Sequence, residues 1–230
     1  MKRLIAADFD GTFNIRGEIP PVNRAGVEAW RAAGGYFGFV TGRGVDFIGT
    51  VRELEIPTDY LLLYNGALLT DADGTVMKEY RIPSPVFADL VRFFAAIPDA
   101  LYYSKAGEET AFRHYYASFA DETRALEVAS LVNARFGDEV TAFVNGVHVN
   151  VGKKGSGKTQ GVLDALAHFG LGADEAAVFG DDYNDLDMIV SLNGWAVSTA
   201  RGAVLQAAPH VCESVGKAAL ALLGEHSFEF

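Results

Sequence analysis

Two aspartates separated by one residue follow an apolar stretch near the start of the chain. Residues 4–7 read Leu-Ile-Ala-Ala, and Asp8 and Asp10 come directly after them, with Gly11 and Thr12 next. Side chains two positions apart on an extended chain lie on the same face, so the two carboxylates are neighbours. Neighbouring carboxylates repel each other unless a cation or a proton compensates their charge. We therefore interpret the pair as part of a site for phosphoryl transfer with magnesium.

Polar residues of similar type follow two further apolar stretches. Thr41 ends one of them, and Asp181 and Asp185 follow another. If these stretches are strands of one open α/β sheet, their carboxyl ends border the crevice in which such sheets bind ligands. A group of carboxylates there suits a hard divalent cation, and Lys158 adds a fixed positive charge. Together these groups predict a site for a phosphoryl group.

The elements that must position these residues alternate between strands and helices over most of the chain. Pro20 and Pro21 are expected to begin a helix, and Gly34 and Gly35 to end it, while another helix is predicted over about 159–169. Strands are predicted over residues 4–7, 36–40, 60–64, 176–179, 195–197 and 210–212. This alternation predicts an α/β fold with a Rossmann-like parallel sheet and helices on both of its faces.

The pattern changes in the segment 83–152, which we predict to be an inserted α+β domain. Its elements are expected in the order helix, strand, strand, helix, strand, strand, and the pair Asn145 and Gly146 indicates a tight hairpin between the last two strands. This order predicts a small antiparallel sheet with both helices on one face. The predicted core then consists of residues 1–82 and 153–230.

Composition limits the classes of partner. The chain has 30 acidic and 19 basic residues and a net charge of −11, which disfavours nucleic acid because binding there requires neutralisation of many phosphates. A small phosphorylated metabolite needs positive charge only locally. With Cys212 as the single cysteine, no internal disulfide can form. The first apolar run is too short for a signal peptide, and no run approaches a membrane span, so we expect a cytoplasmic protein without a membrane partner.

Four motifs in this order make the chain resemble the phosphatases of the haloacid dehalogenase (HAD) superfamily, and among them the Cof-like branch. They are Asp-Phe-Asp-Gly-Thr at 8–12, Thr-Gly-Arg at 41–43, Lys158, and Gly-Asp-Asp-Tyr-Asn-Asp at 180–185. The segment 83–152 takes the position of the family's cap domain. The resemblance implies the HAD fold, a catalytic core with a cap, and a hydrolase that acts on phosphoric monoesters.

The resemblance also implies catalytic roles. Asp8 would attack phosphorus and form an aspartyl phosphate. Asp10 would protonate the leaving alcohol and then take a proton from the hydrolytic water. Thr41 and Lys158 would hold the phosphoryl oxygens as charge builds on them.

The same resemblance implies a Mg²⁺ site. Its ligands would be the Asp8 carboxylate, the backbone carbonyl of Asp10 and the Asp181 carboxylate, with Asp185 acting through a bound water.

Further residues are implied at the substrate or its phosphate. Phe9 would take part through the backbone N–H groups that follow the first aspartate, and Gly42 and Arg43 would line the second motif. Asn65 matches a family loop near the substrate, and Asn184 would reach the phosphate or the metal shell.

Two other interpretations use the same residues. Residues 152–159 read Gly-Lys-Lys-Gly-Ser-Gly-Lys-Thr and satisfy the P-loop pattern, which would make the chain a nucleotide-binding enzyme. The strand before this motif belongs to the predicted Asn-Gly hairpin, however, and the P-loop would leave the first aspartate pair unexplained. A phosphomutase could share the aspartates and the core, with the phosphate returned to a sugar and not passed to water.

The chain departs from the family pattern at two places. Residues 197–200 read Val-Ser-Thr-Ala where the branch has Met-Gly-Asn-Ala, and Gly44 replaces a proline that is common after the second motif. The predicted cap has about 70 residues, which is short for the branch. We expect a small phosphomonoester such as a sugar phosphate as the substrate.

Overall fold

The apolar stretches of the sequence form the middle of an eight-stranded sheet. The computed structural model describes residues 2–104 and 112–224. The strand order is β12-β11-β10-β1-β2-β3-β4-β5, and the first six of these strands are parallel while β4 runs antiparallel to β3. The strands of this sheet are β1 (Leu4–Ala7), β2 (Tyr36–Val40), β3 (Tyr60–Leu63), β4 (Leu68–Asp71), β5 (Val76–Glu79), β10 (Ala176–Gly180), β11 (Trp195–Val197) and β12 (His210–Cys212).

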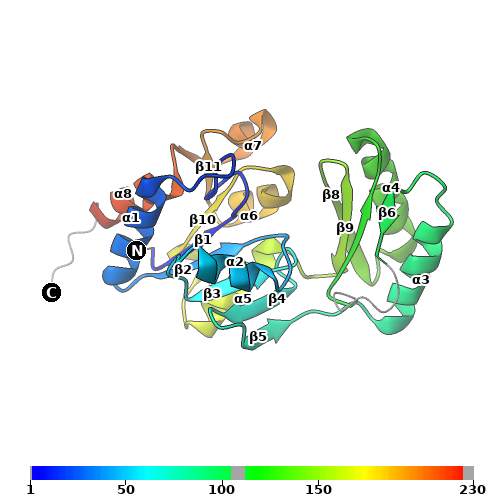
Figure 1. Ribbon diagram of the computed structural model, residues 1–230, viewed down its shortest axis with the longest axis horizontal. Helices are drawn as coiled ribbons and strands as arrows, with labels where there is room; N and C mark the ends of the chain where they lie inside the picture. The colour runs from blue at the N-terminus through cyan, green and yellow to red at the C-terminus, as the bar shows by residue number, and fades with distance from the viewer. Residues whose placement is uncertain (1, 105–111, 225–230) are drawn as a thin grey trace. The chain divides into compact units, whose positions relative to one another are not determined.

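Helices connect β1 to β2, β2 to β3, β10 to β11 and β11 to β12 (Figure 1). They are α1 (Pro21–Ala32), α2 (Phe47–Glu53), α5 (Lys158–His168), α6 (Leu186–Ser191), α7 (Gly202–Ala207) and α8 (Val215–Gly224), with short 3₁₀ turns η1 (Ala173–Glu175) and η2 (Tyr183–Asp185). Helix α1 has proline in its first turn, as expected from the sequence. It lies against α8, where Gly26 faces Gly216 so closely that a Cβ on Gly26 would lie 2.5 Å from the Gly216 Cα. The two glycines therefore permit the contact between these helices.

Both faces of the central sheet are apolar because its parallel strands are buried on both sides. On one face, buried residues of α5 such as Val162 and Leu166 pack with Leu4 and Leu62. On the other face lie phenylalanine rings in edge contacts, among them Phe37 and Phe39. Strand β1 is completely buried in the middle of the sheet. It offers a rigid support for the residues that follow its carboxyl end.

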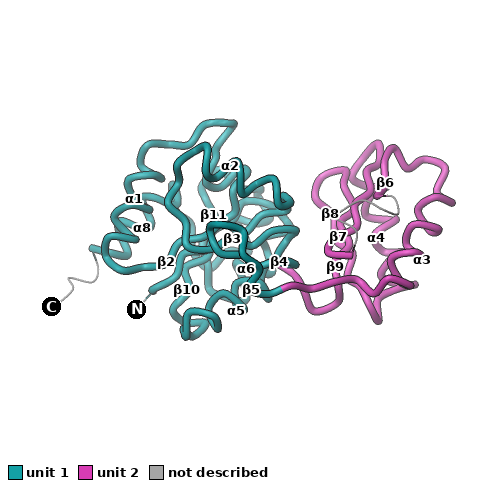
Figure 2. Tube along the Cα trace, turned by 60° about the horizontal axis from the view of Figure 1, so that its bottom comes forward, with its two compact units in different colours: residues 1–78, 158–230 teal, residues 79–157 magenta. Residues whose placement is uncertain are grey.

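The chain divides into two compact units, shown in teal and magenta in Figure 2. The core unit consists of Met1–Lys78 and Lys158–Phe230 and contains the central sheet, and the inserted unit consists of Glu79–Gly157. The sequence pattern placed the corresponding divisions after residues 82 and 152.

The inserted unit contains a four-stranded antiparallel sheet in the order β6-β7-β9-β8. Its elements are α3 (Ser84–Ala95), β6 (Tyr102–Tyr103), β7 (His114–Ser118), α4 (Glu122–Phe136), β8 (Val140–Asn145) and β9 (His148–Lys153). Asp121 caps α4 by accepting a hydrogen bond of 2.9 Å from the Arg124 N–H. Apolar residues of both helices pack with alternate residues of the strands in one buried cluster.

The predicted fold class is confirmed, since the chain has an α/β core with a mostly parallel sheet and an inserted α+β unit. Within residues 2–104 and 112–224, no helix has both the length and the apolarity of a membrane-spanning segment.

Candidate active site

The polar residues singled out in the sequence meet at the carboxyl ends of three adjacent strands of the core unit. Strand β1 lies between β10 and β2. Asp8 follows β1, Thr41 follows β2, and Asp181 follows β10. Because the three strands are parallel, residues more than 100 positions apart in the sequence come to the same edge of the sheet.

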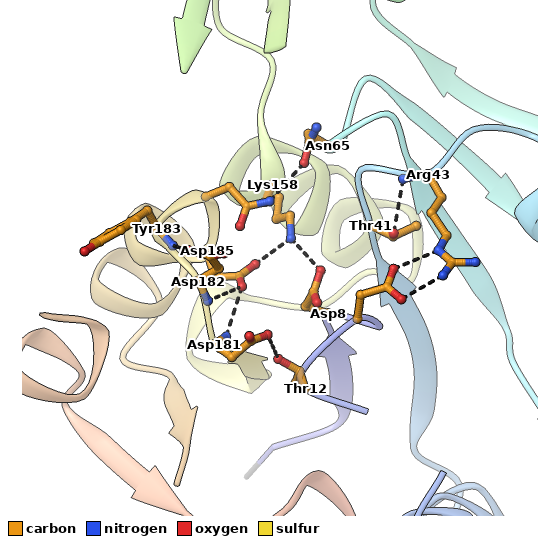
Figure 3. A network of polar contacts seen from close by, with 12 residues as sticks. Asp8, Thr12, Thr41, Arg43, Asn65, Lys158, Asp181, Asp182, Tyr183 and Asp185 are labelled. Carbon is orange, nitrogen blue, oxygen red and sulfur yellow. Dashed lines mark hydrogen bonds and ion pairs between the residues drawn. The ribbon is translucent and has the colours of Figure 1, made fainter. Parts of the chain in front are cut away.

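Lys158 is the centre of this cluster (Figure 3). Its Nζ atom lies 2.6 Å from Oδ1 of Asp8 and 2.5 Å from Oδ1 of Asp185, and all three side chains are at least nine-tenths buried. Burial by itself lowers the pKa of Lys158, but the carboxylates of Asp185 and Asp8 outweigh it and raise that pKa above its ordinary value. The lysine is thus held as a buried cation between an acid that follows β1 and an acid in the turn η2 after β10.

Asp8, Asp181 and Asp185 form an acidic triad. One carboxylate oxygen of each lies within 4.8 Å of the others. Burial raises the pKa of Asp8 well above its ordinary value, against the opposing charge of Lys158. Burial also raises the pKa of Asp181 to about 6, although the hydrogen bond from Thr12 opposes it. In both groups the charge of Lys158 opposes the shift, so positive charge near the triad favours the ionised carboxylates.

The triad meets the requirements of a divalent cation site. It offers hard oxygen donors from three carboxylates, and a cation there would offset both the cost of burying their charges and the repulsion among them. The carboxylates are also fixed in orientation. Thr12 Oγ1 donates to Asp181 Oδ1 at 2.6 Å, and Asp185 Oδ2 accepts the N–H groups of Asp181 and Asp182 at 3.0 and 3.1 Å. These residues therefore fit a hard divalent cation, the class to which Mg²⁺ belongs.

Gly11 gives this arrangement the space that it needs. Its φ is +93°, a conformation that favours glycine, and a Cβ at this position would overlap the Asp181 carboxylate. The glycine of the first motif thus lets the loop after β1 approach the loop after β10.

Asp10 lies apart from the acidic triad. Its carboxylate is half exposed and accepts two hydrogen bonds from Arg43, at 2.7 Å from both Nε and Nη2. The Arg43 guanidinium also lies over the rings of Phe9 and Phe47, 5.2 and 5.4 Å from their centroids. The structure therefore directs the Asp10 side chain to Arg43, and the metal contact expected for Asp10 rests on its backbone carbonyl alone.

Phe9 uses its side chain for packing. The ring is 1% exposed and makes edge contacts with Phe39 and Phe47, with centroids 5.2 and 4.8 Å apart. Its predicted role at a phosphate therefore depends on the backbone. Outside the helices and strands of the described residues, the N–H groups of Phe9, Asp10 and Gly42 donate no backbone hydrogen bond. They are thus available to an anion.

Thr41 and Gly42 are placed by contacts between the loops after β2 and β3. The Thr41 side chain is buried, its Oγ1 accepts the Arg43 N–H at 3.1 Å, and its carbonyl accepts the Asn65 N–H at 2.8 Å. A Cβ on Gly42 would lie 3.2 Å from the side-chain nitrogen of Asn65, so a larger residue there would require the Asn65 amide to shift by a few tenths of an ångström. These contacts give the second motif a fixed conformation.

Asn65 and Asn184, predicted from separate segments, lie next to each other. Asn184 Nδ2 donates to Asn65 Oδ1 at 3.3 Å. Asn65 has a positive φ of 55°, as has Tyr64 before it with 52°. The turn after β3 is therefore held in a conformation that favours asparagine or glycine, and it carries an amide to the loop after β10.

Gly44 lies close to the side chain of Tyr64. A Cβ at this position would lie 2.8 Å from the Tyr64 hydroxyl, which accepts a hydrogen bond from the Val45 N–H at 3.3 Å. Tyr64 thus occupies the space that a Cβ at position 44 would need.

Sequence reasoning missed two parts of the site. Thr12 was identified only as part of the first motif, with no role of its own, although its hydroxyl donates a hydrogen bond to Asp181. Arg201 was not identified at all. Its Nε lies 2.7 Å from Asp182 Oδ1, its guanidinium lies 5.0 Å from the centroid of the Tyr183 ring, and its backbone N–H donates to the Asp181 carbonyl. No sequence signal indicates this arginine, because it follows the segment that departs from the family pattern.

The P-loop interpretation of residues 152–159 is wrong. The preceding strand β9 pairs antiparallel with both β7 and β8, whereas a P-loop follows a strand of a parallel sheet. Lys158 binds two carboxylates, and the Thr159 hydroxyl donates to Asp187. The side chains of both residues thus bind aspartates of the core unit.

Comparison with known families and structures agrees with this geometry. A family model described as haloacid dehalogenase-like hydrolase matches residues 5–112 and 103–222. A haloacid dehalogenase-like hydrolase from Bacillus subtilis has a similar fold, with a TM-score of 0.82 at 16% identity over 98% of this chain and 100% of that one.

Two further solved structures are similar. One is a Bacteroides thetaiotaomicron protein studied among the phosphatases of the HAD superfamily, with a TM-score of 0.80 at 18% identity over 97% of this chain and 95% of that one. The other is a sugar phosphatase of HAD subclass IIB, with a TM-score of 0.78 at 19% identity over 97% and 99%. At these identities the structures show the same fold.

Proposed function

The chain belongs to the haloacid dehalogenase-like hydrolases, and from this premise we propose that it is a magnesium-dependent phosphatase that hydrolyses a small phosphomonoester through an aspartyl phosphate. The main observation in support of the proposal is that Lys158 binds Asp8 and Asp185, two members of the acidic triad. A buried cation beside three carboxylates and a hydroxyl is the set of groups that phosphoryl transfer requires.

In the first step, an Asp8 carboxylate oxygen attacks phosphorus, and the bond from phosphorus to the ester oxygen breaks. Lys158 holds Oδ1 of Asp8, which fixes the rotation of the carboxylate before the attack. Asp10 gives its proton to the departing alcohol oxygen. The products of this step are the free alcohol and an aspartyl phosphate on Asp8.

In the second step, water attacks the phosphorus of the aspartyl phosphate, and the bond to the Asp8 oxygen breaks. Asp10, now ionised, takes a proton from the attacking water. Asp8 returns to its carboxylate form, and inorganic phosphate leaves. Asp10 serves in both steps only if Arg43 releases it, and the half-exposed position of the ion pair permits that movement.

In the proposed mechanism, charge on the phosphoryl oxygens is stabilised in both steps by groups of the core unit. These are the Lys158 ammonium, the Thr41 hydroxyl and the N–H groups of Phe9, Asp10 and Gly42. Mg²⁺ held by Asp8, the Asp10 carbonyl and Asp181, with Asp185 behind it, would supply further positive charge to these oxygens.

The substrate class follows from the same chemistry. The Lys158 ammonium provides positive charge locally in an otherwise acidic protein, which suits one phosphoryl group on a small metabolite. The similarity to a structure described as a sugar phosphatase supports a sugar phosphate or a related ester.

The test is the hydrolysis of p-nitrophenyl phosphate with Mg²⁺ by Asp8→Asn, Asp10→Asn and the control Asp73→Asn. Asp8→Asn removes the nucleophile but keeps its shape, so we expect kcat to fall by at least about 10⁴-fold. Asp73 lies on an exposed hairpin, and its variant should keep the wild-type rate.

The intermediate is tested on Asp10→Asn, which lacks the base for the second step. After an acid quench during turnover, mass spectrometry should find one phosphoryl group on the peptide that contains Asp8. Wild-type turnover by Asp8→Asn, or a phosphoryl group on another residue, would refute the mechanism.

A further inference from the structure

The loop after β11 lies next to the segment after β10, which carries Asp181 and Asp185 of the acidic triad. Strands β10 and β11 pair in parallel, so the residues that follow them come to the same edge of the core sheet. Arg201 ends the loop after β11 and stands directly before α7. It contacts three consecutive residues of the neighbouring segment, which are Asp181, Asp182 and Tyr183. Arg201 thus joins the two segments.

The backbone of Arg201 is fixed on both sides. The Arg201 carbonyl accepts the N–H groups of Val204 and Leu205 in the first turn of α7, at 2.9 and 3.0 Å. Val204 is completely buried, which anchors this turn in the core unit. The Arg201 N–H donates to the Asp181 carbonyl at 3.0 Å. The side chain of Arg201 therefore extends from a backbone that hydrogen bonds and packing hold in place.

The peptide group between Asp181 and Asp182 links Arg201 to the acidic triad. Its C=O accepts the Arg201 N–H, and its N–H donates to Oδ2 of Asp185 at 3.1 Å. The same Asp185 oxygen accepts the Asp181 N–H at 3.0 Å (Figure 3). Because the C=O and N–H of a peptide group lie in one plane and move together, rotation of this group would break both of its bonds. The orientation of the Asp185 carboxylate is thus coupled to the position of Arg201.

The Arg201 side chain fixes the next two residues of the same segment. Its Nε lies 2.7 Å from Oδ1 of Asp182, the oxygen that also accepts the Tyr183 N–H at 2.6 Å. Its guanidinium lies 5.0 Å from the centroid of the Tyr183 ring. A planar guanidinium can pair with a carboxylate and stack on a ring at once, whereas the compact ammonium of lysine cannot. The side chain therefore holds the start of the turn η2, of which Asp185 is the last residue.

Stability alone gives little reason for these side-chain contacts. The side chain of Arg201 is 42% exposed and that of Asp182 is 20% exposed, and ion pairs this open to solvent contribute little to the free energy of unfolding. Residues that orient metal ligands have larger effects, since their removal typically lowers metal affinity by about 10- to 100-fold. The contacts of Arg201 are of this second kind, because they fix the segment that carries two members of the acidic triad.

We propose that Arg201 is a positioning residue of the metal site and that it favours Mg²⁺ over Ca²⁺. Mg²⁺ demands near-ideal octahedral geometry with short bonds, whereas Ca²⁺ accepts flexible ligands at longer distances. Arg201 holds the segment with Asp181 and Asp185 in one arrangement, and fixed ligands favour the more demanding ion. The inference rests on the proposed function, since that function supplies the magnesium site.

The test measures the affinity of the full-length protein for Mg²⁺ and for Ca²⁺ by isothermal titration calorimetry, without substrate. Arg201→Met removes the charge and the planar group, and Arg201→Lys keeps the charge alone. We expect the Kd for Mg²⁺ to rise about tenfold in both variants, and the Kd for Ca²⁺ to rise less than about threefold. The control Arg52→Met breaks an exposed ion pair with Asp73 elsewhere in the core unit and should change neither Kd.

The direction of the change separates positioning from charge. If Arg201 acted only through its charge, its removal would tighten the binding of both ions, and Arg201→Lys would bind as wild type does. Tighter Mg²⁺ binding in Arg201→Met, wild-type affinity in Arg201→Lys, or equal losses for the two ions would overturn the proposal. Far-ultraviolet circular dichroism without metal should be the same in all variants, and loss of folded structure in Arg201→Lys would show a structural role and overturn the proposal as well.

Failure of the proposed function gives a different result. If wild type binds no Mg²⁺, the metal site and this inference are overturned together. If wild type binds Mg²⁺ but hydrolyses no phosphomonoester, only the proposed function fails, and the affinities of the two Arg201 variants still decide the inference in the way given above.

Discussion

The two units of this protein bury polar groups in opposite ways. In the core unit, the cation of Lys158 is enclosed between the carboxylates of Asp8 and Asp185. In the inserted unit, His114 and Asn150 are similarly buried, but both are neutral and satisfy each other by hydrogen bonding. Buried charge is costly unless it is paired, whereas a buried neutral group needs only one partner.

The difference shows how recognition can be divided along one chain. A charge cluster that is already paired can exchange its partners for an anionic group and a metal ion. A neutral network has no net charge to offer and selects by the number and direction of its hydrogen bonds. The core unit thus holds the paired charges that the proposed phosphoryl chemistry would use, and the inserted unit holds a neutral network.

The largest effect is expected when the ion pairs of the core unit are broken. Lys158→Met leaves two buried carboxylates without a counter-charge, which should lower the free energy of unfolding by about 3–5 kcal/mol and abolish activity. Urea unfolding followed by tryptophan fluorescence measures the loss, because Trp30 and Trp195 both lie in the core unit.

The control for this variant is Lys217→Met, which breaks the exposed pair with Glu213 and should cost less than about 1 kcal/mol. Similar losses in the two lysine variants would mean that the buried pairs of Lys158 contribute no more than a surface pair.

The next effect is a pH dependence located in the inserted unit. Because burial lowers the pKa of folded His114 to about 4, the unfolded chain takes up the proton more readily. The contribution of His114 to the free energy of unfolding is therefore fully present above pH 6.5. It decreases by about 3 kcal/mol as the pH falls from 6.5 through 4. Urea unfolding followed by far-ultraviolet circular dichroism should show it, and the neutral variant His114→Gln should remove that part of the slope. A pKa near 6.5 for folded His114, measured by NMR titration, would contradict the prediction.

The smallest effect is the response of the core unit to magnesium. A cation on the acidic triad relieves the repulsion among its carboxylates, so Mg²⁺ at ten times its dissociation constant should stabilise the folded state by about 1.4 kcal/mol. Thermal unfolding followed by tryptophan fluorescence measures the shift. Asp181→Asn should reduce it, and an unchanged shift in that variant would place the ion elsewhere.

Much of the fold could be predicted because it depends on local patterns. Short apolar runs bounded by glycine and proline indicated the parallel strands, and the pair Asn145 and Gly146 indicated the hairpin of β8 and β9. The strand ends then indicated where polar residues would gather, and the structure brings Asp8, Asp181, Asp185 and Lys158 together there. The roles assigned to these residues remain proposals that the variants above test.

Other features could not be predicted, since they depend on pairs of residues far apart in the sequence. Arg201 reaches Asp182 and Tyr183 only through the position of the loop after β11. The P-loop pattern matched the sequence fully, yet the antiparallel pairing of β9 excludes it.

The sequence by itself determined the types of chemical group, their order and the strand ends at which they lie, because backbone preference and hydrophobic period act over a few residues. Only the tertiary structure decided which groups touch. It directs Asp10 to Arg43, holds Lys158 between Asp8 and Asp185, and brings His114 next to Asn150 through the register of β7 and β9. Such contacts depend on strand order, register and side-chain rotamers, which are set by packing across the whole unit and not by neighbours along the chain.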